Sequence, residues 1–215
     1  ESKLFTPVTF GPLTLRNRTI RSAAFESMCP GNAPSDMLLD YHRSVAAGGI
    51  GMTTVAYAAV TQSGLSFDRQ LWMRPEIIPG LRRLTDAIHA EGAAAGIQLG
   101  HCGNMSHKSI CGCMPVGASS GFNLYSPTFV RGLRADELPE MARAYGRSVN
   151  LAREAGFDSV EIHAGHGYLI SQFLSPSTNH RKDEFGGSLQ NRMRFMDMVM
   201  EEVMKAAGSD MAVLV

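Results

Sequence analysis

Residues 158–195 read DSVEIHAGHGYLISQFLSPSTNHRKDEFGGSLQNRMRF, and residues 160–164 of this stretch predict a buried β-strand. Because successive side chains of a strand face opposite ways, Glu161 and His163 share one face and the apolar side chains share the other. Polar groups on one face, where a strand ends, are typical of a barrel with helices outside and a reactive mouth at the carboxyl ends of its strands.

Three side chains able to move protons follow the end of this strand. His163, His166 and Tyr168 fall within six residues. Gly165 and Gly167 lie between them and allow a sharp turn or a close approach to a ligand. The segment is therefore a candidate proton-handling site.

The rest of the chain alternates strands and helices, which predicts parallel strands joined by right-handed crossovers. No G-x-G-x-x-G motif follows the first strand, which counts against a dinucleotide-binding sheet. The expected fold is a (β/α)8 TIM barrel, of which the chain covers about the first five strands, so that three more would follow Val215. We expect these strands near residues 19–24, 51–57, 94–99, 159–163 and 211–215.

Four helices are expected between the strands, from the helical spacing of apolar residues and from capping signals. They cover residues 36–47, a segment from Pro75 to before Gly92, one capped by Asp136 and ending at Gly156, and one capped by Ser188 and ending at Gly208. The apolar positions of the last helix include Leu189 and Met193.

Two further segments stand outside this alternation. Residues 8–10 and 13–15 flank Gly11-Pro12 and predict a short hairpin, a plug or lid rather than part of the main sheet. Residues 101–134 are rich in Gly, Ser and Cys, and predict a long mobile loop over the substrate pocket, with Cys111 and Cys113 as free thiols.

Composition narrows the class of partner. Lys plus Arg and Asp plus Glu number 20 each, so no net charge directs the chain to nucleic acid or to an anionic membrane. No apolar run has the length of a membrane span, and the N-terminus does not read as a signal peptide. The first residue is Glu1 rather than Met, so we expect that the sequence has been trimmed. Four cysteines are few for this length, which favours a reducing, cytoplasmic compartment.

Three motifs resemble the old yellow enzyme family of NADH:flavin oxidoreductases, from about residue 4 to the end of the chain. They are NRTIRSA at 17–23, GIQLGHCG at 96–103, and HAGHGYLISQFLSPSTN at 163–179, the last followed by DEFGGSLQNR at 183–192. The sequence is most similar to the branch of 2,4-dienoyl-CoA reductase and 2-enoate reductase, which also includes trimethylamine dehydrogenase.

The resemblance implies an FMN-binding barrel domain over residues 1–215, incomplete at its C-terminal side. It implies an enzyme that takes hydride from NADH or NADPH and reduces an activated C=C bond in a small-molecule enoate, enoyl-CoA or enone. The resemblance leaves open whether a C-terminal region outside this sequence carries a 4Fe-4S cluster and FAD. It also leaves open whether the protein forms a homo-oligomer.

The resemblance also assigns cofactor contacts. Gln98 would hydrogen-bond the pyrimidine edge of the flavin, because an amide offers both a donor and an acceptor. Small side chains and backbone would line the ring at Ala23, Ala24, Phe25 and Ala56. Many relatives have Cys or Thr where this chain has Phe25, and Arg where it has Asn104. The basic residue that faces the flavin in relatives would come just after Val215.

By the same resemblance, His163 and His166 hold the carbonyl oxygen of the substrate and Tyr168 protonates its α-carbon. Hydride addition at the β-carbon builds negative charge on that oxygen, which two imidazole donors stabilise. A phenol can then act as the general acid.

Other readings stay open at this point. The same flavin could remove hydride from a C–N bond in an amine dehydrogenase, or the chain could be a non-catalytic barrel segment. Zinc at His163 and His166 is disfavoured because their separation of three residues around Gly165 fits neither a helical pair nor a closed ligand set. The cysteines and histidines of residues 101–113 also lack a usual zinc spacing, so no metal is expected.

Overall fold

Six parallel strands form the main sheet of the protein in a computed structural model that describes residues 2–215. Their spatial order is β11-β10-β6-β4-β3, and the short β5 pairs with the end of β4. Every pairing in this sheet is parallel, which confirms the expected topology. The strands are β3 (Ile20–Arg21), β4 (Met52–Ala59), β5 (Leu71–Trp72), β6 (Ala94–Gly100), β10 (Ser159–Ile162) and β11 (Ala212–Leu214).

The first strand is shorter than predicted, since β3 ends at Arg21 rather than near residue 24. Beyond Arg21 the chain leaves the sheet, and the Arg21 guanidinium donates to the carbonyl oxygen of Ala24. The Glu26 carboxylate accepts from the backbone N–H of Ala56 on β4. Side-chain hydrogen bonds therefore replace the strand over these residues.

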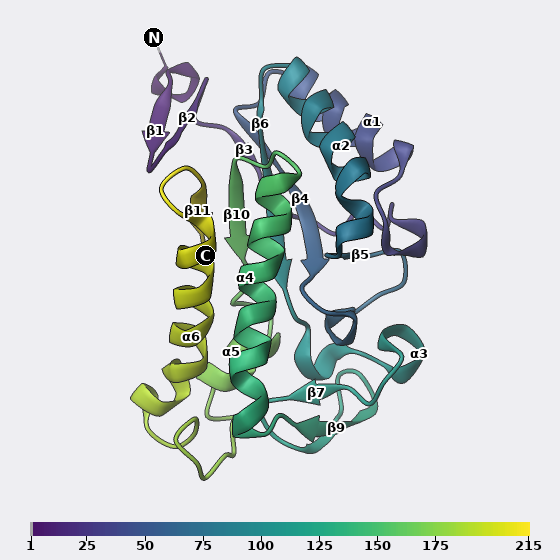
Figure 1. The fold of residues 1–215 in the computed structure, drawn as a ribbon, viewed down its shortest axis with the longest axis vertical. Helices are drawn as coiled ribbons and strands as arrows, with labels where there is room; N and C mark the ends of the chain where they lie inside the picture. The colour runs from purple at the N-terminus through teal and green to yellow at the C-terminus, as the bar shows by residue number, and fades with distance from the viewer. Residues whose placement is uncertain (1) are drawn as a thin grey trace.

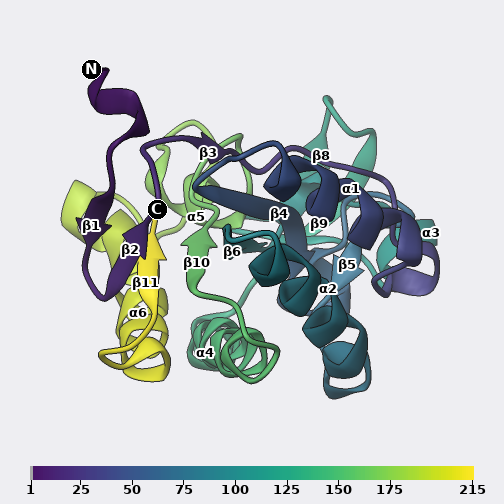
Figure 2. The ribbon, with the colours of Figure 1, turned by 90° about the horizontal axis from the view of Figure 1, so that it is seen from above.

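Four long helices follow the strands, as expected: α1 (Asp36–Ala47), α2 (Ile78–Ala90), α4 (Leu138–Glu154) and α6 (Leu189–Ala207). Figure 2 shows α2, α4 and α6 side by side on one face of the sheet. Apolar side chains of that face, such as Val55, Ile97 and Val160, form one core with these helices. The opposite face carries smaller and polar groups, and there Ser159 Oγ lies 3.2 Å from Met52 Sδ.

The predicted start signal was right for α6 and displaced for α2 and α4. Pro75 begins a 3₁₀ turn, η4 (Pro75–Ile77), and α2 follows that turn. Ser188 Oγ accepts from the N–H of Asn191 at the start of α6, as predicted. Asp136 does not cap α4, because it lies inside a 3₁₀ turn, η6 (Ala135–Glu137), and its carboxylate pairs with Arg134. Glu137 precedes α4 without capping it through its side chain, and its carboxylate instead accepts from the N–H of Arg134 at 2.7 Å, at the start of the 3₁₀ turn.

The apolar face expected for α6 was also partly wrong. Leu189 is 60% exposed and Met193 is 39% exposed, whereas Phe195, Val199 and Val203 are fully buried. Leu189 is the first residue of the helix, before the stripe that packs on α4 and α5 (Leu169–Leu174).

Residues 101–134 contain five short elements of secondary structure, which corrects the expectation of an irregular loop, whereas the expected mobility stays a prediction. The segment contains a small sheet of order β7-β9-β8, in which Phe122 of β8 lies opposite Phe129 of β9 with ring centroids 5.2 Å apart. Each strand is too short to give a clear alternation in a segment rich in glycine and serine. The elements are η5 (Gly103–Met105), α3 (Lys108–Cys111), β7 (Val116–Gly117), β8 (Gly121–Asn123) and β9 (Thr128–Gly132).

The predicted N-terminal hairpin is present as β1 (Val8–Phe10) and β2 (Leu13–Leu15), paired antiparallel. Figure 1 shows the hairpin at one end of the molecule, while the arrows of β4 and β10 point to the other end, where α3, β7 and β9 gather. The hairpin therefore cannot be a lid over the carboxyl ends of the strands. No helix within residues 2–215 combines the length and the apolar character needed to cross a bilayer.

Candidate active site

The turn after β10 positions the predicted catalytic side chains. The N–H of His163 donates to the carbonyl oxygen of Leu99 at 2.9 Å, which extends the strand pairing one residue past Ile162. His166 and Gly167 both have left-handed backbone conformations, with φ of 55° and 69°. Left-handed φ is uncommon outside glycine and is enriched at functional sites. The turn thus folds the chain back and gathers the three side chains.

An aromatic cluster results, and it contains a residue that the sequence did not suggest. The Tyr168 ring stacks on His163 with centroids 4.7 Å apart and an interplanar angle of 24°. Tyr57 meets both rings edge-on, at 5.7 Å from His163 and 5.4 Å from Tyr168. Its hydroxyl donates to the carbonyl oxygen of Gly64 at 2.8 Å. Tyr57 lies within an otherwise apolar β4 segment, where it read as an ordinary strand residue.

Hydrogen bonds define the proton positions on His163. The N–H of Gly165 donates to His163 Nδ1 at 3.3 Å, so this nitrogen is an acceptor and Nε2 carries the proton. His163 Nε2 lies 3.0 Å from His166 Nδ1. Burial, reinforced by the neighbouring His166, lowers the pKa of His163 to about 4. His163 is therefore a neutral hydrogen-bond donor at neutral pH.

Tyr168 keeps its proton for a different reason. Burial raises the pKa of its phenol above the ordinary value, and a hydrogen bond with Ser66 opposes this rise. A phenol whose pKa is raised remains protonated across the neutral range. The side chain can then act as a general acid rather than as a phenolate.

Gln98 lies on the neighbouring strand, on the face away from the helices. It stands opposite Glu161 in the β6–β10 register, and its Nε2 donates to Glu161 Oε1 at 2.6 Å. Within residues 2–215 no hydrogen bond involves the Gln98 amide oxygen. Alternation along β4 places Ala56, which is 5% exposed, on the same face. An amide with one acceptor and one N–H to spare thus stands next to a small side chain.

The segment Ala23–Phe25 is held by a buried carboxylate. Glu26 Oε1 accepts from Arg21 Nη1 at 2.7 Å and from the N–H of Ala56 at 3.2 Å. It also lies 3.2 Å from Nε2 of the fully buried His42. This carboxylate therefore connects the two segments that were assigned to the cofactor.

The structure gathers the predicted residues into two groups at adjacent strand ends. His163, His166 and Tyr168 form the first group, after β10. The second comprises Gln98, Ala56 and the irregular segment with Ala23 and Ala24. Phe25 stands apart, since it is 44% exposed and stacks on Phe67 with centroids 5.1 Å apart. The sequence did not predict a role for Glu26, which it marks only as an acidic residue among small and apolar neighbours. It also indicated no role for Glu161.

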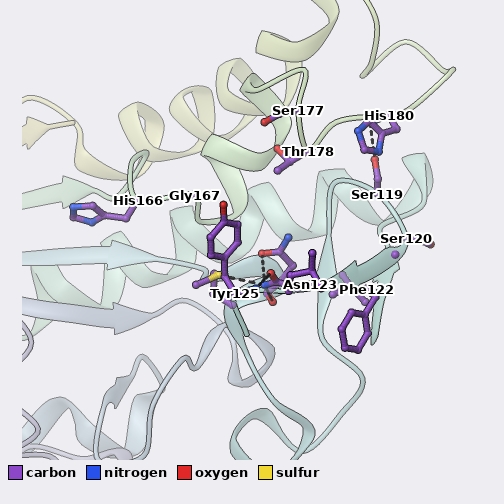
Figure 3. A pocket seen from close by; sticks show the side chains of 15 residues that line it. Ser119, Ser120, Phe122, Asn123, Tyr125, His166, Gly167, Ser177, Thr178 and His180 are labelled. Carbon is purple, nitrogen blue, oxygen red and sulfur yellow. Dashed lines mark hydrogen bonds between the residues drawn. The ribbon is translucent and has the colours of Figure 1, made fainter. Parts of the chain in front are cut away.

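A cleft of about 510 Å³ opens beside the turn after β10, and Figure 3 shows the side chains around the cleft. His166 and Gly167 line the cleft, whereas His163 and Tyr168 do not. In Figure 3 the His166 ring points away from the other lining side chains. The cleft therefore reaches the turn after β10 but not the rest of the aromatic cluster. The polar residues that line the cleft include Ser119, Ser177, Thr178 and His180.

Within the part of the chain that the structure describes, no three His, Cys, Asp or Glu side chains are arranged to hold a metal ion. All four cysteines are free thiols there.

Comparison with known proteins identifies the family. The profile of the NADH:flavin oxidoreductase / NADH oxidase family matches residues 3–215. The chain belongs to this family. FMN and a nicotinamide cofactor are typical of its members.

Similar proteins agree with this assignment to the flavin oxidoreductases. The chain is 43% identical over 210 residues to a 4,4'-dithiodibutanoate disulfide reductase of Rhodococcus erythropolis, covering 98% of this chain and 52% of that protein. It is 37% identical over 206 residues to an NADPH dehydrogenase of Bacillus subtilis, covering 94% and 60%. The chain thus spans between half and two thirds of the length of these relatives.

A solved structure extends the agreement to the fold. The old yellow enzyme homologue from Zymomonas mobilis superposes with a TM-score of 0.91 at 30% identity, over 99% of this chain and 62% of that one. The parallel strands of the main sheet are therefore part of a TIM barrel of the old yellow enzyme type, as expected.

Proposed function

We propose that residues 1–215 belong to an FMN-binding barrel domain of an NAD(P)H-dependent oxidoreductase that reduces the activated C=C bond of an enoate, enoyl-CoA or enone. The observation that carries this proposal is the geometry after β10. Two imidazole nitrogens lie 3.0 Å apart, and a protonated phenol stacks on one of the rings at 4.7 Å. Such a group combines donors for a carbonyl oxygen with an acid for the adjacent carbon.

The residues on the neighbouring strands fit a flavin. The spare acceptor and N–H of Gln98 match a ring edge that offers both a donor and acceptors. Ala56, Ala23 and Ala24 present small side chains beside it, and Glu26 fixes their spacing. Bound FMN would accept hydride from NADH or NADPH and supply it to the substrate.

The histidines would bind the substrate carbonyl. The His163 Nε2–H would donate a hydrogen bond to the carbonyl oxygen of the substrate. In the structure this N–H faces His166 Nδ1. An imidazole ring always carries at least one N–H, so His166 would offer that group as a second hydrogen-bond donor. One such donor typically contributes about 3 kcal/mol to stabilising an oxyanion in a transition state.

Tyr168 would deliver the proton to the α-carbon once charge has moved there. The ring stacks on His163, so the acid stands next to the group that orients the carbonyl. A positioned general acid usually contributes about 10²- to 10⁴-fold in rate.

Anaerobic reduction of the full-length protein tests the proposal. We expect NADH or NADPH to bleach the bound flavin, and an enoate, enoyl-CoA or enone to restore its colour. Amines as reductants, and 4,4'-dithiodibutanoate as oxidant, serve as comparison arms, the latter because the Rhodococcus relative bears that name. Reduction by an amine together with no reoxidation by any enoate would contradict the proposal.

We also infer a cytoplasmic location, because four cysteines held as free thiols suit a reducing compartment. Recovery of the protein only in extracytoplasmic fractions would refute this inference.

A further inference from the structure

A pair of thiols lies near the candidate active site and has no role in the proposed reaction. Cys111 ends α3, and Cys113 follows after Gly112. Gly112 has φ of 75°, a left-handed conformation that glycine adopts readily. The turn places Cys111 Sγ 3.8 Å from Cys113 Sγ.

The two thiols differ in access to solvent. Cys113 is exposed, whereas Cys111 is only 2% exposed. The other two cysteines, Cys29 and Cys102, are also buried. Among residues 2–215, Cys113 is thus the one thiol that a dissolved reagent can reach directly, and Cys111 stands behind it as a second thiol.

The surroundings place the pair next to the aromatic cluster. Ile110, which precedes Cys111, packs with Tyr168 against the buried group of Tyr57, Ala59 and Leu65. Burial and the neighbouring Cys111 raise the pKa of the Cys113 thiol, and Arg131 opposes the rise. A raised pKa keeps Cys113 mostly protonated near neutral pH, so its thiolate fraction increases only as the solution becomes alkaline.

We propose that Cys111 and Cys113 form a two-electron redox site that reacts with low-molecular-weight organic disulfides. The Cys113 thiolate attacks one sulfur of the disulfide RSSR, forms a Cys113–SR bond and releases RS⁻. The Cys111 thiolate then attacks Cys113 Sγ, closes a Cys111–Cys113 disulfide and releases a second RS⁻. The two cysteines lose two electrons and two protons, and RSSR becomes two RSH.

The geometry explains why closure would follow the first exchange. The sulfur of Cys111 must approach Cys113 Sγ from 3.8 Å to about 2.05 Å, a movement that a side-chain rotation and a small shift of the Gly112 turn can supply. No step passes through FMN, so the site does not depend on the proposed flavin chemistry.

Oxidised glutathione is the probe for the experiment, applied to the full-length protein at about pH 9 to raise the thiolate fraction. Peptide mass spectrometry should show residues 111–113 lighter by two hydrogens, with two glutathione thiols released and no lasting adduct. Cys111→Ser should stop at a single glutathione on Cys113. Cys113→Ser should leave the segment unmodified, and Cys29→Ser, the matched control at a buried thiol, should close the disulfide as wild type does.

Two results would overturn the proposal. One is a stable glutathione adduct on Cys113 in wild type, equal in amount to that of Cys111→Ser, since it would mean that Cys111 cannot resolve it. The other is no reaction at Cys113 under conditions in which the unfolded protein reacts. Cys111→Ala is the second variant, in case the serine hydroxyl disturbs the buried position, and it should also trap the adduct.

Discussion

At the scale of single residues, the site depends on side chains that meet across neighbouring strands. Gly100 is the clearest case, because it leaves room for the aromatic cluster. A Cβ at this position would lie 2.5 Å from Tyr57 Cε2 and 3.0 Å from His163 Cβ. Tyr57 cannot swing away easily, since its hydroxyl is bonded to Gly64.

Gly100→Ala should therefore lower the free energy of unfolding by about 1–3 kcal/mol, the usual effect of overpacking a core. Denaturant unfolding of the full-length protein measures it. Gly121→Ala is the control, because no atom lies within 4 Å of its added Cβ, and it should change stability by less than about 0.5 kcal/mol. Equal effects of the two substitutions would contradict the close packing.

Glu26 should be more important to stability than an exposed carboxylate. Glu26→Gln removes the charge that faces Arg21 at 2.7 Å, where the two side chains are 5% and 15% exposed. We expect a loss of about 1–3 kcal/mol in the free energy of unfolding, because a buried charged donor loses its partner. Glu76→Gln is the matched control, as Glu76 is 74% exposed and 4.0 Å from Arg74. Its loss should stay below about 1 kcal/mol.

We expect two buried histidines to make the free energy of unfolding depend on pH. Burial lowers the pKa of His101 to about 3 and of His163 to about 4, both below the ordinary value of 6.5. Between pH 6.5 and 4 the unfolded chain binds protons that the folded chain does not, so stability falls on acidification.

Denaturant midpoints from pH 7 down to about 5 measure this slope, in a range where carboxylates contribute little. His101→Gln should flatten it, whereas His180→Gln, at an exposed position, should not. An unchanged slope in His101→Gln would show that His101 does not supply it.

The sequence indicated the chemical types of the site residues better than it indicated which side chains contact each other. His163, His166 and Tyr168 were predicted as one group, and the turn after β10 brings them together. Glu26 and Tyr57 were not predicted, because their partners come from distant segments. Their importance depends on contacts that a pattern in one segment cannot show.

At the scale of elements, the Arg181 guanidinium connects the segment 101–134 to the loop after α5. Arg181, with a side chain 8% exposed, donates to the carbonyl oxygens of Ala118 and Leu133 and pairs with Asp183 at 2.5 Å. These carbonyls flank the small sheet formed by β7, β8 and β9.

Arg181→Met should loosen that sheet, because two buried carbonyl groups lose a charged donor. Amide hydrogen exchange of residues 116–133 should accelerate about tenfold or more, since 1.4 kcal/mol corresponds to a factor of ten. Arg134→Met, at a side chain 66% exposed, is the control and should leave exchange unchanged. Unaltered exchange in Arg181→Met would mean that Arg181 does not stabilise the small sheet of residues 116–133.

Long periodic elements were predictable and short ones were not. Ser35 and Ser188 cap α1 and α6, and apolar periodicity marked α2 and α4 within a few residues. The strands β7, β8 and β9 span two to five residues each, and pairing between distant residues determines them. Asp136 failed as a cap because Arg134 captures its carboxylate.

At the scale of the whole molecule, the alternation of strands and helices was enough to predict the parallel sheet and its order. The register was not predictable, since the pairing of Gln98 with Glu161 depends on how β6 and β10 align. That pairing leaves half of the Gln98 amide available on the inner face. The sequence therefore indicated the architecture and the chemical groups, and the register determines how they meet.

The central claim is that Tyr168 donates the proton while His163 and His166 hold the carbonyl. Single-turnover kinetics of the full-length protein test it most directly, with flavin reduction by nicotinamide and reoxidation by an enoate followed separately. Tyr168→Phe should leave the reduction nearly unchanged and slow the reoxidation by about 10²- to 10⁴-fold. His163→Ala should instead weaken enoate binding and reoxidation together. Tyr125→Phe, at a side chain 93% exposed, should behave as wild type. Reoxidation of Tyr168→Phe at the wild-type rate would contradict the account, because the proton would then come from another group.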